Sequence, residues 1–184
     1  MPELPLPSQP LICDDIALRP WCEDDAATLA ILCRDDDIAR WTNAPSDYRE
    51  ADGRSYIRRV EEERRAGRGV YYAVVDAAGD RLLGACDLRI SPADPHVGEV
   101  GFLLGAHARG RGRMARAVRL IARWGFEELG LRRIEVLVHP ENLAAARVAE
   151  SACFTREGLL RAYREKHGER EDRVVFSLLP ADLT

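Results

Sequence analysis

The chain lacks several features that would mark it as a specialised class of protein. Among its 184 residues, 27 are lysine or arginine and 31 are aspartate or glutamate, so the formal net charge is −4. Domains that mainly bind nucleic acid are usually strongly basic, so this balance argues against that role. No apolar run approaches the roughly 20 residues that a membrane-spanning helix needs. The first residues, 1–7, lack the charged and apolar regions of a signal peptide. We therefore expect a cytoplasmic protein that binds neither nucleic acid nor a membrane.

Cysteine and histidine are too few and too scattered to suggest a cross-linked or zinc-bound fold. No CxxC motif is present, and the odd number of cysteines favours free thiols in a reducing compartment. The five cysteines stand at positions 13, 22, 33, 86 and 153. The four histidines lack metal-site spacing, so no metal is expected. At this length, a composition that is 46% hydrophobic and 32% charged predicts one globular domain over 11–184, preceded by a proline-rich arm over 1–10.

The hydrophobic pattern predicts an α+β fold with a mixed, mostly antiparallel sheet flanked by helices. Helices are expected at 23–32, 46–65, 113–129 and 143–152. Strands are expected at 16–19, 70–75, 82–88, 97–104, 133–138, 154–160 and 173–179. The strands from 70 to 104, with a turn at 76–80, form an antiparallel meander. A strand–glycine loop–helix–strand unit then lies at the centre of the sheet.

The glycine-rich loop before the helix at 113–129 is the most informative segment. Gly110 and Gly112 allow the backbone to approach a ligand closely, and the N-terminus of the following helix attracts an anion. Three arginines add positive charge at positions 109, 111 and 113. A phosphate or pyrophosphate group suits such a loop.

Three phosphate-bearing ligands compete for this loop. A nucleoside triphosphate needs the motif GxxxxGK[ST], which is absent. A dinucleotide is a remote alternative, because residues 110–115 match G-x-G-x-x-A and Glu135 lies on the next strand. However, Glu135 lies in the middle of its strand, and an antiparallel meander replaces the repeated βαβ units of a dinucleotide fold. Coenzyme A is the third ligand.

Here the chain resembles the GNAT N-acetyltransferase superfamily. Residues 107–112, His-Ala-Arg-Gly-Arg-Gly, are similar to its acetyl-CoA motif Q/R-x-x-G-x-G/A, with His107 at the first position. Residues 139–142 and 152–158 resemble the N-x-x-S…GF…EG tail of the RimJ/RimL-like branch, and the similarity extends over about residues 11 to 182. The tyrosine that protonates the leaving thiolate in many GNAT enzymes is replaced by Ala149.

The resemblance implies where acetyl-CoA binds. The loop would hold the pyrophosphate mainly through backbone N–H groups, and the end of the strand at 97–104 would expose unpaired N–H groups to the thioester and pantetheine. Asn142 would bond the pantetheine arm, although asparagine at this place also suits a helix cap. The implied cofactor-binding residues are Phe102, Leu103, Leu104, His107, Arg109, Gly110, Arg111, Gly112, Arg113, Met114 and Asn142.

The implied reaction moves an acetyl or longer acyl group to a primary amine by direct transfer through a tetrahedral intermediate. The amine must lose a proton before it attacks. Glu99 has the family's position for the base, with a solvated strand carboxylate as the alternative. Ser151 is a weak candidate for the thiolate acid, and Tyr163 resembles an aromatic residue near the acceptor site.

The acceptor pocket is expected to involve residues 22–65 and the loop near Tyr163, with Trp41 and Tyr48 in its lining. A protein N-terminus and a small-molecule amine both fit as acceptors, and homodimers are frequent in this branch. The alternative function is a non-catalytic acyl-CoA sensor or protein-interaction domain.

Two further expectations concern packing. Cys86 and Cys153 lie in apolar contexts and are expected in the core. The spacing of four arginines predicts one solvated face of the helix at 113–129; they are Arg113, Arg116, Arg119 and Arg123.

Overall fold

One mixed sheet organises the computed structural model, which describes residues 2–45, 47–78, 81–166 and 168–183. Its eight strands follow the order β1-β2-β3-β4-β5-β6-β8-β7. The strands are β1 (Leu11–Cys13), β2 (Ile16–Pro20), β3 (Gly69–Asp76), β4 (Leu82–Ile90), β5 (Val97–Leu104), β6 (Arg133–Val138), β7 (Thr155–Lys166) and β8 (Glu169–Leu178). The helices are α1 (Asp25–Leu32), α2 (Asp36–Trp41), α3 (Glu50–Arg65), α4 (Arg113–Glu128) and α5 (Leu143–Ser151). Within these described ranges, no helix is both long and apolar enough to cross a membrane.

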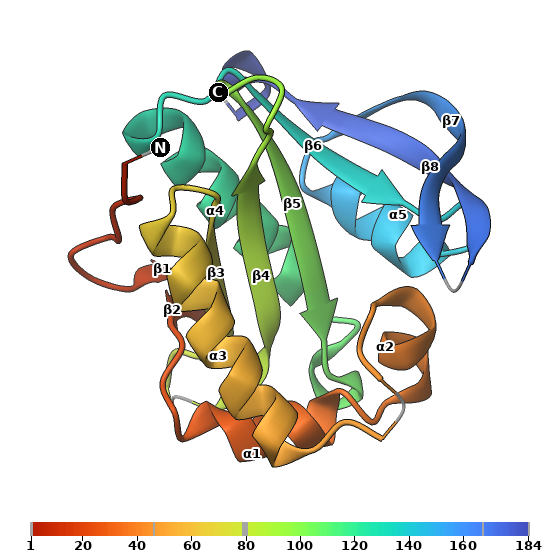
Figure 1. The fold of residues 1–184 in the computed structure, drawn as a ribbon. Helices are drawn as coiled ribbons and strands as arrows, with labels where there is room; N and C mark the ends of the chain where they lie inside the picture. The colour runs from red at the N-terminus through yellow and green to blue at the C-terminus, as the bar shows by residue number, and fades with distance from the viewer. Residues whose placement is uncertain (1, 46, 79–80, 167, 184) are drawn as a thin grey trace.

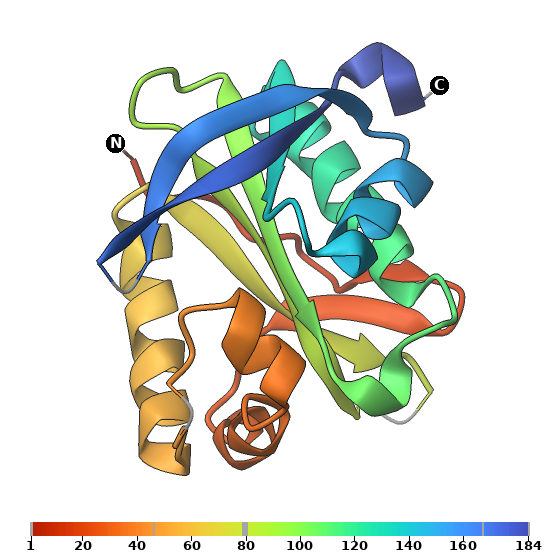
Figure 2. The ribbon, with the colours of Figure 1, turned by 90° about the vertical axis from the view of Figure 1, so that its right-hand side faces the viewer.

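Helices cover both faces of the sheet. Figure 1 shows α1 and α3 in front of strands β2 to β4, with α4 behind them. Figure 2 shows the sheet between α3 on one side and α4 with α5 on the other. The larger core lies on the α4 side and includes Tyr72, Val118 and Trp124, whereas a smaller cluster on the α1 side includes Leu29 and Ala73. Alternate residues of β3 therefore enter different cores, as a strand covered on both faces requires.

Strands β5 and β6 run parallel and then separate. Their register contains only the pairs Val97–Arg133, Gly98–Ile134 and Glu99–Glu135, although β5 continues to Leu104. The two arrows diverge visibly in Figure 1. After Glu99, the edge of β5 that faces β6 is therefore not paired with another described strand.

The α+β class and the mixed, mostly antiparallel sheet are confirmed. The structure adds β1 and α2, which the sequence pattern did not predict. Helix α3 begins at Glu50, where Asp52 accepts a hydrogen bond from the Arg49 N–H; the predicted start at Ser46 lies outside the described residues. The predicted turn at 76–80 also includes two residues, 79–80, outside them.

The last two strands are longer than predicted. The expected strands at 154–160 and 173–179 are parts of the β7–β8 hairpin, which pairs from Thr155–Ser177 to Lys166–Glu169. Most of β7 is exposed, and half of its 12 residues are charged. Its length therefore follows from pairing with β8 and not from an apolar pattern that could be recognised in the sequence.

Two packing expectations are wrong in part. Cys86 is buried, but Cys153 is exposed and adopts a left-handed conformation with φ 70°. Cys153 stands at the place of the glycine in the GF pair of the tail that residues 152–158 resemble, and glycine adopts positive φ freely. Arg113 is only 5% exposed and does not belong to a solvated face. An ion pair that the sequence pattern does not reveal holds it in the interior.

Candidate functional site

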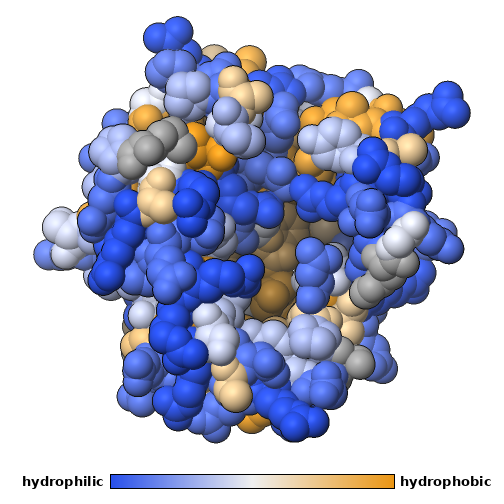
Figure 3. All heavy atoms as spheres, viewed as in Figure 1, coloured by the Kyte–Doolittle hydropathy of each residue, from blue (hydrophilic) through white to orange (hydrophobic). Residues whose placement is uncertain are grey.

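A cavity of about 670 Å³ lies where β5 and β6 separate. Figure 3 shows the face hollowed near its centre, with hydrophobic residues at the bottom and hydrophilic residues around the rim. The lining comes from β5 and β6, the start of α5, residues 41–45 with Tyr48, α3 and the β7–β8 hairpin. The tip of this hairpin is tied to α2, because the Lys166 Nζ donates to the Arg40 carbonyl at 2.5 Å. The cavity is therefore bounded by both halves of the chain.

The separated edge of β5 offers backbone groups to a ligand. The Gly105 N–H donates to the Leu83 carbonyl of β4 at 2.8 Å. Because N–H directions alternate along a strand, those of Phe102 and Leu104 point to the other side, where β6 no longer pairs. An extended ligand carrying amide groups can bond there as an added strand does.

The glycine loop leaves its backbone accessible. Gly110 and Gly112 have φ values of 80° and 66°, and Gly112 is the N-cap of α4. No atom outside the adjoining residues would lie within 4 Å of a Cβ on Gly110. The N–H groups at the start of α4, those of Arg113, Met114 and Ala115, have no partner within the helix, whose first bond runs from the Arg116 N–H to the Gly112 carbonyl. Together they form a concentrated set of donors for an anion.

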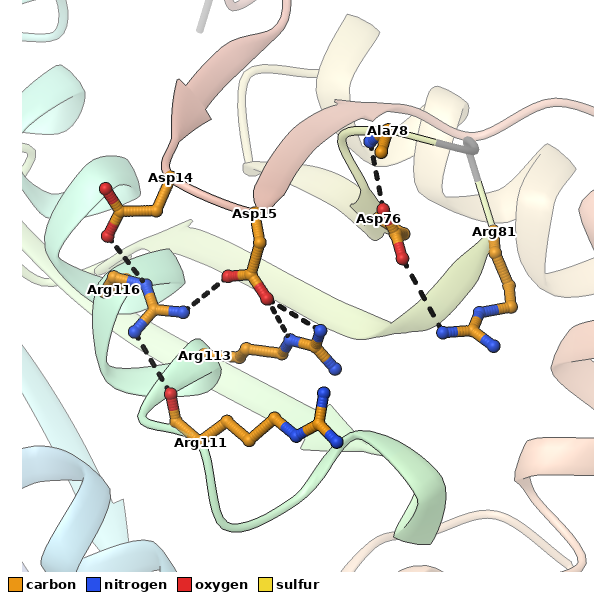
Figure 4. Close-up of polar contacts among 8 residues, drawn as sticks. All are labelled: Asp14, Asp15, Asp76, Ala78, Arg81, Arg111, Arg113 and Arg116. Atoms are coloured by element: carbon orange, nitrogen blue, oxygen red, sulfur yellow. Dashed lines mark hydrogen bonds and ion pairs between the residues drawn. The ribbon is translucent and has the colours of Figure 1, made fainter.

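A group of ion pairs, of which only Arg113 is fully buried, braces this loop, as Figure 4 shows. Asp15, in the turn between β1 and β2, accepts hydrogen bonds from Arg113 Nε at 2.7 Å and Arg116 Nη2 at 2.6 Å. The bond from Arg113 holds the pKa of Asp15 below its usual range. Arg116 Nη1 also donates to the Arg111 carbonyl at 3.1 Å. The side chain of Arg113 is thus occupied by Asp15, which leaves its backbone N–H as the group that it can offer to a ligand.

The other two arginines of the loop differ in availability. Arg109 donates to Asp35 at 2.8 Å and to Asp37 at 2.9 Å, which ties the loop to the start of α2. Arg111 is exposed, and no described residue forms an ion pair with its guanidinium. Arg111 is therefore the loop arginine that is free for a phosphate group. His107 is exposed at the base of the loop.

Several predicted residues meet in the cavity. Phe102, Leu103, Asn142, Trp41 and Tyr48 all line it. The Asn142 Oδ1 accepts a hydrogen bond from the Ala145 N–H at 3.0 Å, so it caps α5. The side-chain NH₂ group of Asn142 stays available to a ligand. The helix-cap and ligand roles are consequently compatible.

The predicted base, Glu99, also lines the cavity but is held on one oxygen by two guanidinium groups. Its Oε1 accepts from Arg89 at 2.9 Å and from Arg164 at 3.0 Å. Arg164 belongs to β7, so Glu99 anchors the hairpin above the cavity. Its catalytic role stays a prediction.

Ser151 and Tyr163 are not brought to the cavity. Ser151 is exposed at the end of α5, and Tyr163 is 48% exposed on β7, while its neighbour Arg164 faces inward. Leu104 lies beyond the lining, although its backbone is on the separated edge. The roles assigned to these side chains stay predictions.

The structure adds a group of cavity residues that sequence reasoning missed. Asp87 and Arg89 lie on β4, Tyr71 lies on β3, and Tyr56 and Arg59 lie on α3. A signal was present: two charged residues at alternate positions interrupt the otherwise apolar strand at 82–90. Charged residues in a strand covered on both faces need a special reason.

Comparisons with known proteins agree with this geometry. The family described as Acetyltransferase (GNAT) domain matches residues 15–155. The Bacillus subtilis (strain 168) protein named "Probable N-acetyltransferase YjcK" is 34% identical over 138 residues, which are 74% of this chain and 76% of that protein. The "Uncharacterized N-acetyltransferase p20" of Bacillus licheniformis is 28% identical over 169 residues, 92% of this chain and 95% of that one.

Solved structures share the fold. Mycobacterium smegmatis RimJ in complex with CoA-disulfide superposes with a TM-score of 0.82 at 22% identity, covering 91% of this chain and 83% of that one. The ribosomal-protein-S5-alanine acetyltransferase of Vibrio fischeri superposes with a TM-score of 0.80 at 24% identity, covering 96% of this chain and all of that one.

Proposed function

The chain belongs to the GNAT acetyltransferase family and is an acetyl-CoA-dependent N-acetyltransferase, and from this premise we propose that it acetylates a primary amine bound in the cavity. The observation that carries the proposal is the continuity of three features: the donor-rich loop at 109–114, the separated edge of β5 and the cavity beyond it. The loop and edge suit the cofactor, and the cavity suits the acceptor.

The residues present fit coenzyme A. The open backbone around Gly110, the first turn of α4 and the free Arg111 suit its phosphate groups. The N–H groups of Phe102 and Leu104 and the side-chain NH₂ of Asn142 suit the amides of its pantetheine arm. When bound there, acetyl-CoA supplies an acetyl group activated as a thioester.

The acceptor amine enters between residues 41–45, α3 and the hairpin. It arrives protonated at neutral pH, so a carboxylate in the cavity must take one proton before the nitrogen can attack. Glu99 is the residue that the family resemblance assigns to this step. Ala149 is fully buried where a tyrosine acid would stand, so α5 supplies no acid there for the leaving thiolate. Thiols ionise near pH 8.5, so a thiolate leaves without one.

The N-terminal amine of another protein and the amine of a small molecule both fit as acceptors. The fold is shared with the Vibrio fischeri ribosomal-protein-S5-alanine acetyltransferase, so peptides with a free α-amine deserve the first test. The alternative is a sensor that binds acyl-CoA without turnover. A cytoplasmic location and a homodimer stay predictions.

A turnover assay tests the proposal. Release of free thiol from acetyl-CoA is measured with small amines and with short peptides that have free or blocked N-termini. Thiol release that depends on a free amine is expected; CoA binding without release from any amine would favour the sensor. In parallel, CoA at a hundredfold excess over its Kd should stabilise the fold by about 2.7 kcal/mol. That corresponds to roughly 5–10 °C in Tm for a chain of this length. NAD should give no comparable shift, and a shift with NAD alone would revive the dinucleotide alternative.

A further inference from the structure

A carboxylate lies directly over the separated strand at the bottom of the cavity. Asp87 on β4 pairs with Gly101 on β5, two residues beyond the last β5–β6 pair at Glu99. A Cβ on Gly101 would lie 2.7 Å from Asp87 Oδ2 and 3.0 Å from Oδ1. Only glycine at this position leaves room for the carboxylate. The Asp87 side chain therefore covers the strand where the thioester would lie.

One carboxylate oxygen of Asp87 accepts no hydrogen bond from the described part of the chain in this position. Its side chain is 19% exposed, and its Oδ1 is buried without a hydrogen bond from any described residue. Arg89 Nε forms an ion pair with that oxygen at 2.9 Å, in an arrangement without hydrogen-bond geometry, so the oxygen can still accept a hydrogen bond. A buried carboxylate oxygen without a hydrogen bond is costly, so the site is suited to a donor that arrives with a ligand.

Glu99 is placed differently. Its Oε1 already accepts from Arg89 and Arg164, which join β4 and β7. Protonation of Glu99 would weaken both ion pairs and loosen the hairpin. Of the two carboxylates, Asp87 is the one that can exchange a proton without releasing a structural element.

The groups around Asp87 favour a cation. Tyr71 lies opposite Asp87 across β3 and β4, and Tyr56 approaches from α3. Burial and then the Asp87 charge raise the pKa of Tyr71 to about 12, so this hydroxyl stays neutral at physiological pH. Aromatic rings beside a carboxylate bind ammonium groups well.

We propose that Asp87 binds the ammonium group of the acceptor between Tyr56 and Tyr71 and takes its proton, while Glu99 positions the hairpin. The proposal rests on the acetyltransferase function proposed above and deepens it. It defines the acceptor as an unhindered primary amine whose charged nitrogen can reach Gly101 at the bottom of the cavity.

The proposed step balances. The ammonium group gives one proton to the Asp87 carboxylate, which becomes a neutral acid, and the amine nitrogen is left with its lone pair. That pair forms the N–C bond to the acetyl carbon as the C=O π electrons move to oxygen. When the C=O bond re-forms, the C–S bond breaks and sulfur takes its electrons. The second nitrogen proton neutralises the thiolate, and Asp87 returns its own proton to solvent.

The surroundings of Asp87 raise its pKa overall, which favours proton transfer from the ammonium group to this carboxylate. Burial raises the pKa of the Asp87 carboxyl, whereas Arg89 opposes the rise and Glu99 adds to it. The Gly101 N–H also lowers it. From α3, Tyr56 and the exposed Arg59 complete the surroundings. A carboxylate with a raised pKa is a stronger proton acceptor than an ordinary one at neutral pH.

Two isosteric variants test the proposal kinetically, because each removes one negative charge from the same cavity. Asp87→Asn should lower kcat/KM for the active amine by about 10²–10⁴-fold at pH 7, with the Kd of acetyl-CoA unchanged by calorimetry. Its kcat/KM should recover by about tenfold per pH unit towards the pKa of the amine, because unprotonated acceptor then needs no base. Glu99→Gln should lose less and show no such recovery. Near-normal turnover in Asp87→Asn, with the large loss in Glu99→Gln, would overturn the proposal.

A second measurement does not depend on turnover. The ¹³C carboxyl signal of Asp87, identified by its absence in Asp87→Asn, is followed during titration with n-butylammonium and with neutral n-butanol. A shift with n-butylammonium alone is expected, and an unchanged signal would refute the ammonium site. If Asp87→Asn does not fold, Gly101→Ala replaces it, since the added Cβ displaces the carboxylate. A wild-type protein that acetylates no amine would refute the proposed function, and the titration would still decide the Asp87 site.

Discussion

Substitution of Gly110 by alanine separates two properties of the loop at 109–114: its proposed role as the cofactor loop and the stability of its backbone. Gly110 has φ 80°, and its missing Cβ would meet no other part of the chain within 4 Å. The left-handed conformation costs a non-glycine residue about 1–2 kcal/mol. Part of this cost is offset, because alanine lowers the entropy of the unfolded chain by about 0.4–1 kcal/mol. The net loss of stability should be about 1 kcal/mol, which corresponds to roughly 2–4 °C in Tm at this chain length.

Gly130 provides a matched control at the other end of α4. It has φ 66° and equally open surroundings, and the 16 residues of α4 separate it from the loop by roughly 24 Å. Gly130→Ala should therefore lose about as much stability as Gly110→Ala. Differential scanning calorimetry of both variants measures this first half of the prediction.

The two variants should differ in CoA affinity. If the loop holds the pyrophosphate through its N–H groups, the new methyl group disturbs at least one hydrogen bond to a charged group, worth about 1.5–3 kcal/mol. Gly110→Ala should then raise the Kd of CoA roughly 10- to 150-fold, and Gly130→Ala should leave it unchanged. Isothermal titration calorimetry gives both values. Equal Kd values in the two variants would refute the placement of the phosphate groups on this loop.

Two predictions concern groups outside the cavity. Tyr72 is fully buried against Trp124, and its hydroxyl has no hydrogen-bond partner among the described residues. Tyr72→Phe should raise the free energy of unfolding by about 1 kcal/mol, measured by urea denaturation; a loss of stability would show that the hydroxyl is satisfied. Hydrogen bonds from Arg133 and Ser177 lower the pKa of Glu157 to about 2. Because the folded pKa is depressed, this stabilisation is complete above pH 4.5 and is lost as the pH falls towards 2. Glu157→Gln should thus lower the free energy of unfolding at pH 7 and make it less dependent on pH between 4.5 and 2. If Tm falls with decreasing pH as steeply in the variant as in the wild type, the ion pair is contradicted.

Features that depend on neighbouring residues could be predicted from the sequence. The loop around Gly110 and Gly112 was recognisable because its backbone conformation, its glycines and the following helix are adjacent in the chain. The mixed sheet followed from alternating apolar residues and from turn residues between them. Asn142 was recognisable for the same reason, since a helix cap depends on only three following residues.

Only the tertiary structure brought distant residues together. Arg113 has the appearance of a surface residue in the sequence, but Asp15, 98 positions away, holds it in the interior. Helix α2 has few apolar residues, and its start is held by Arg109 from the cofactor loop. Such pairs depend on strand order and loop closure, which local patterns do not contain.

The arrangement of the carboxylates in the cavity could be predicted least from the sequence. Glu99 could be singled out because it precedes the cofactor loop on the same strand, but its engagement by Arg164 of β7 could not. Asp87 is separated from Gly101 by a turn, and its importance follows from the register of β4 and β5 together with the departure of β6. The fold class and the glycine loop before α4 could be predicted from the sequence, because short-range backbone preferences specify both. The set of residues that line the cavity follows only from three-dimensional packing, because these residues come from separate strands and helices that the folded sheet aligns.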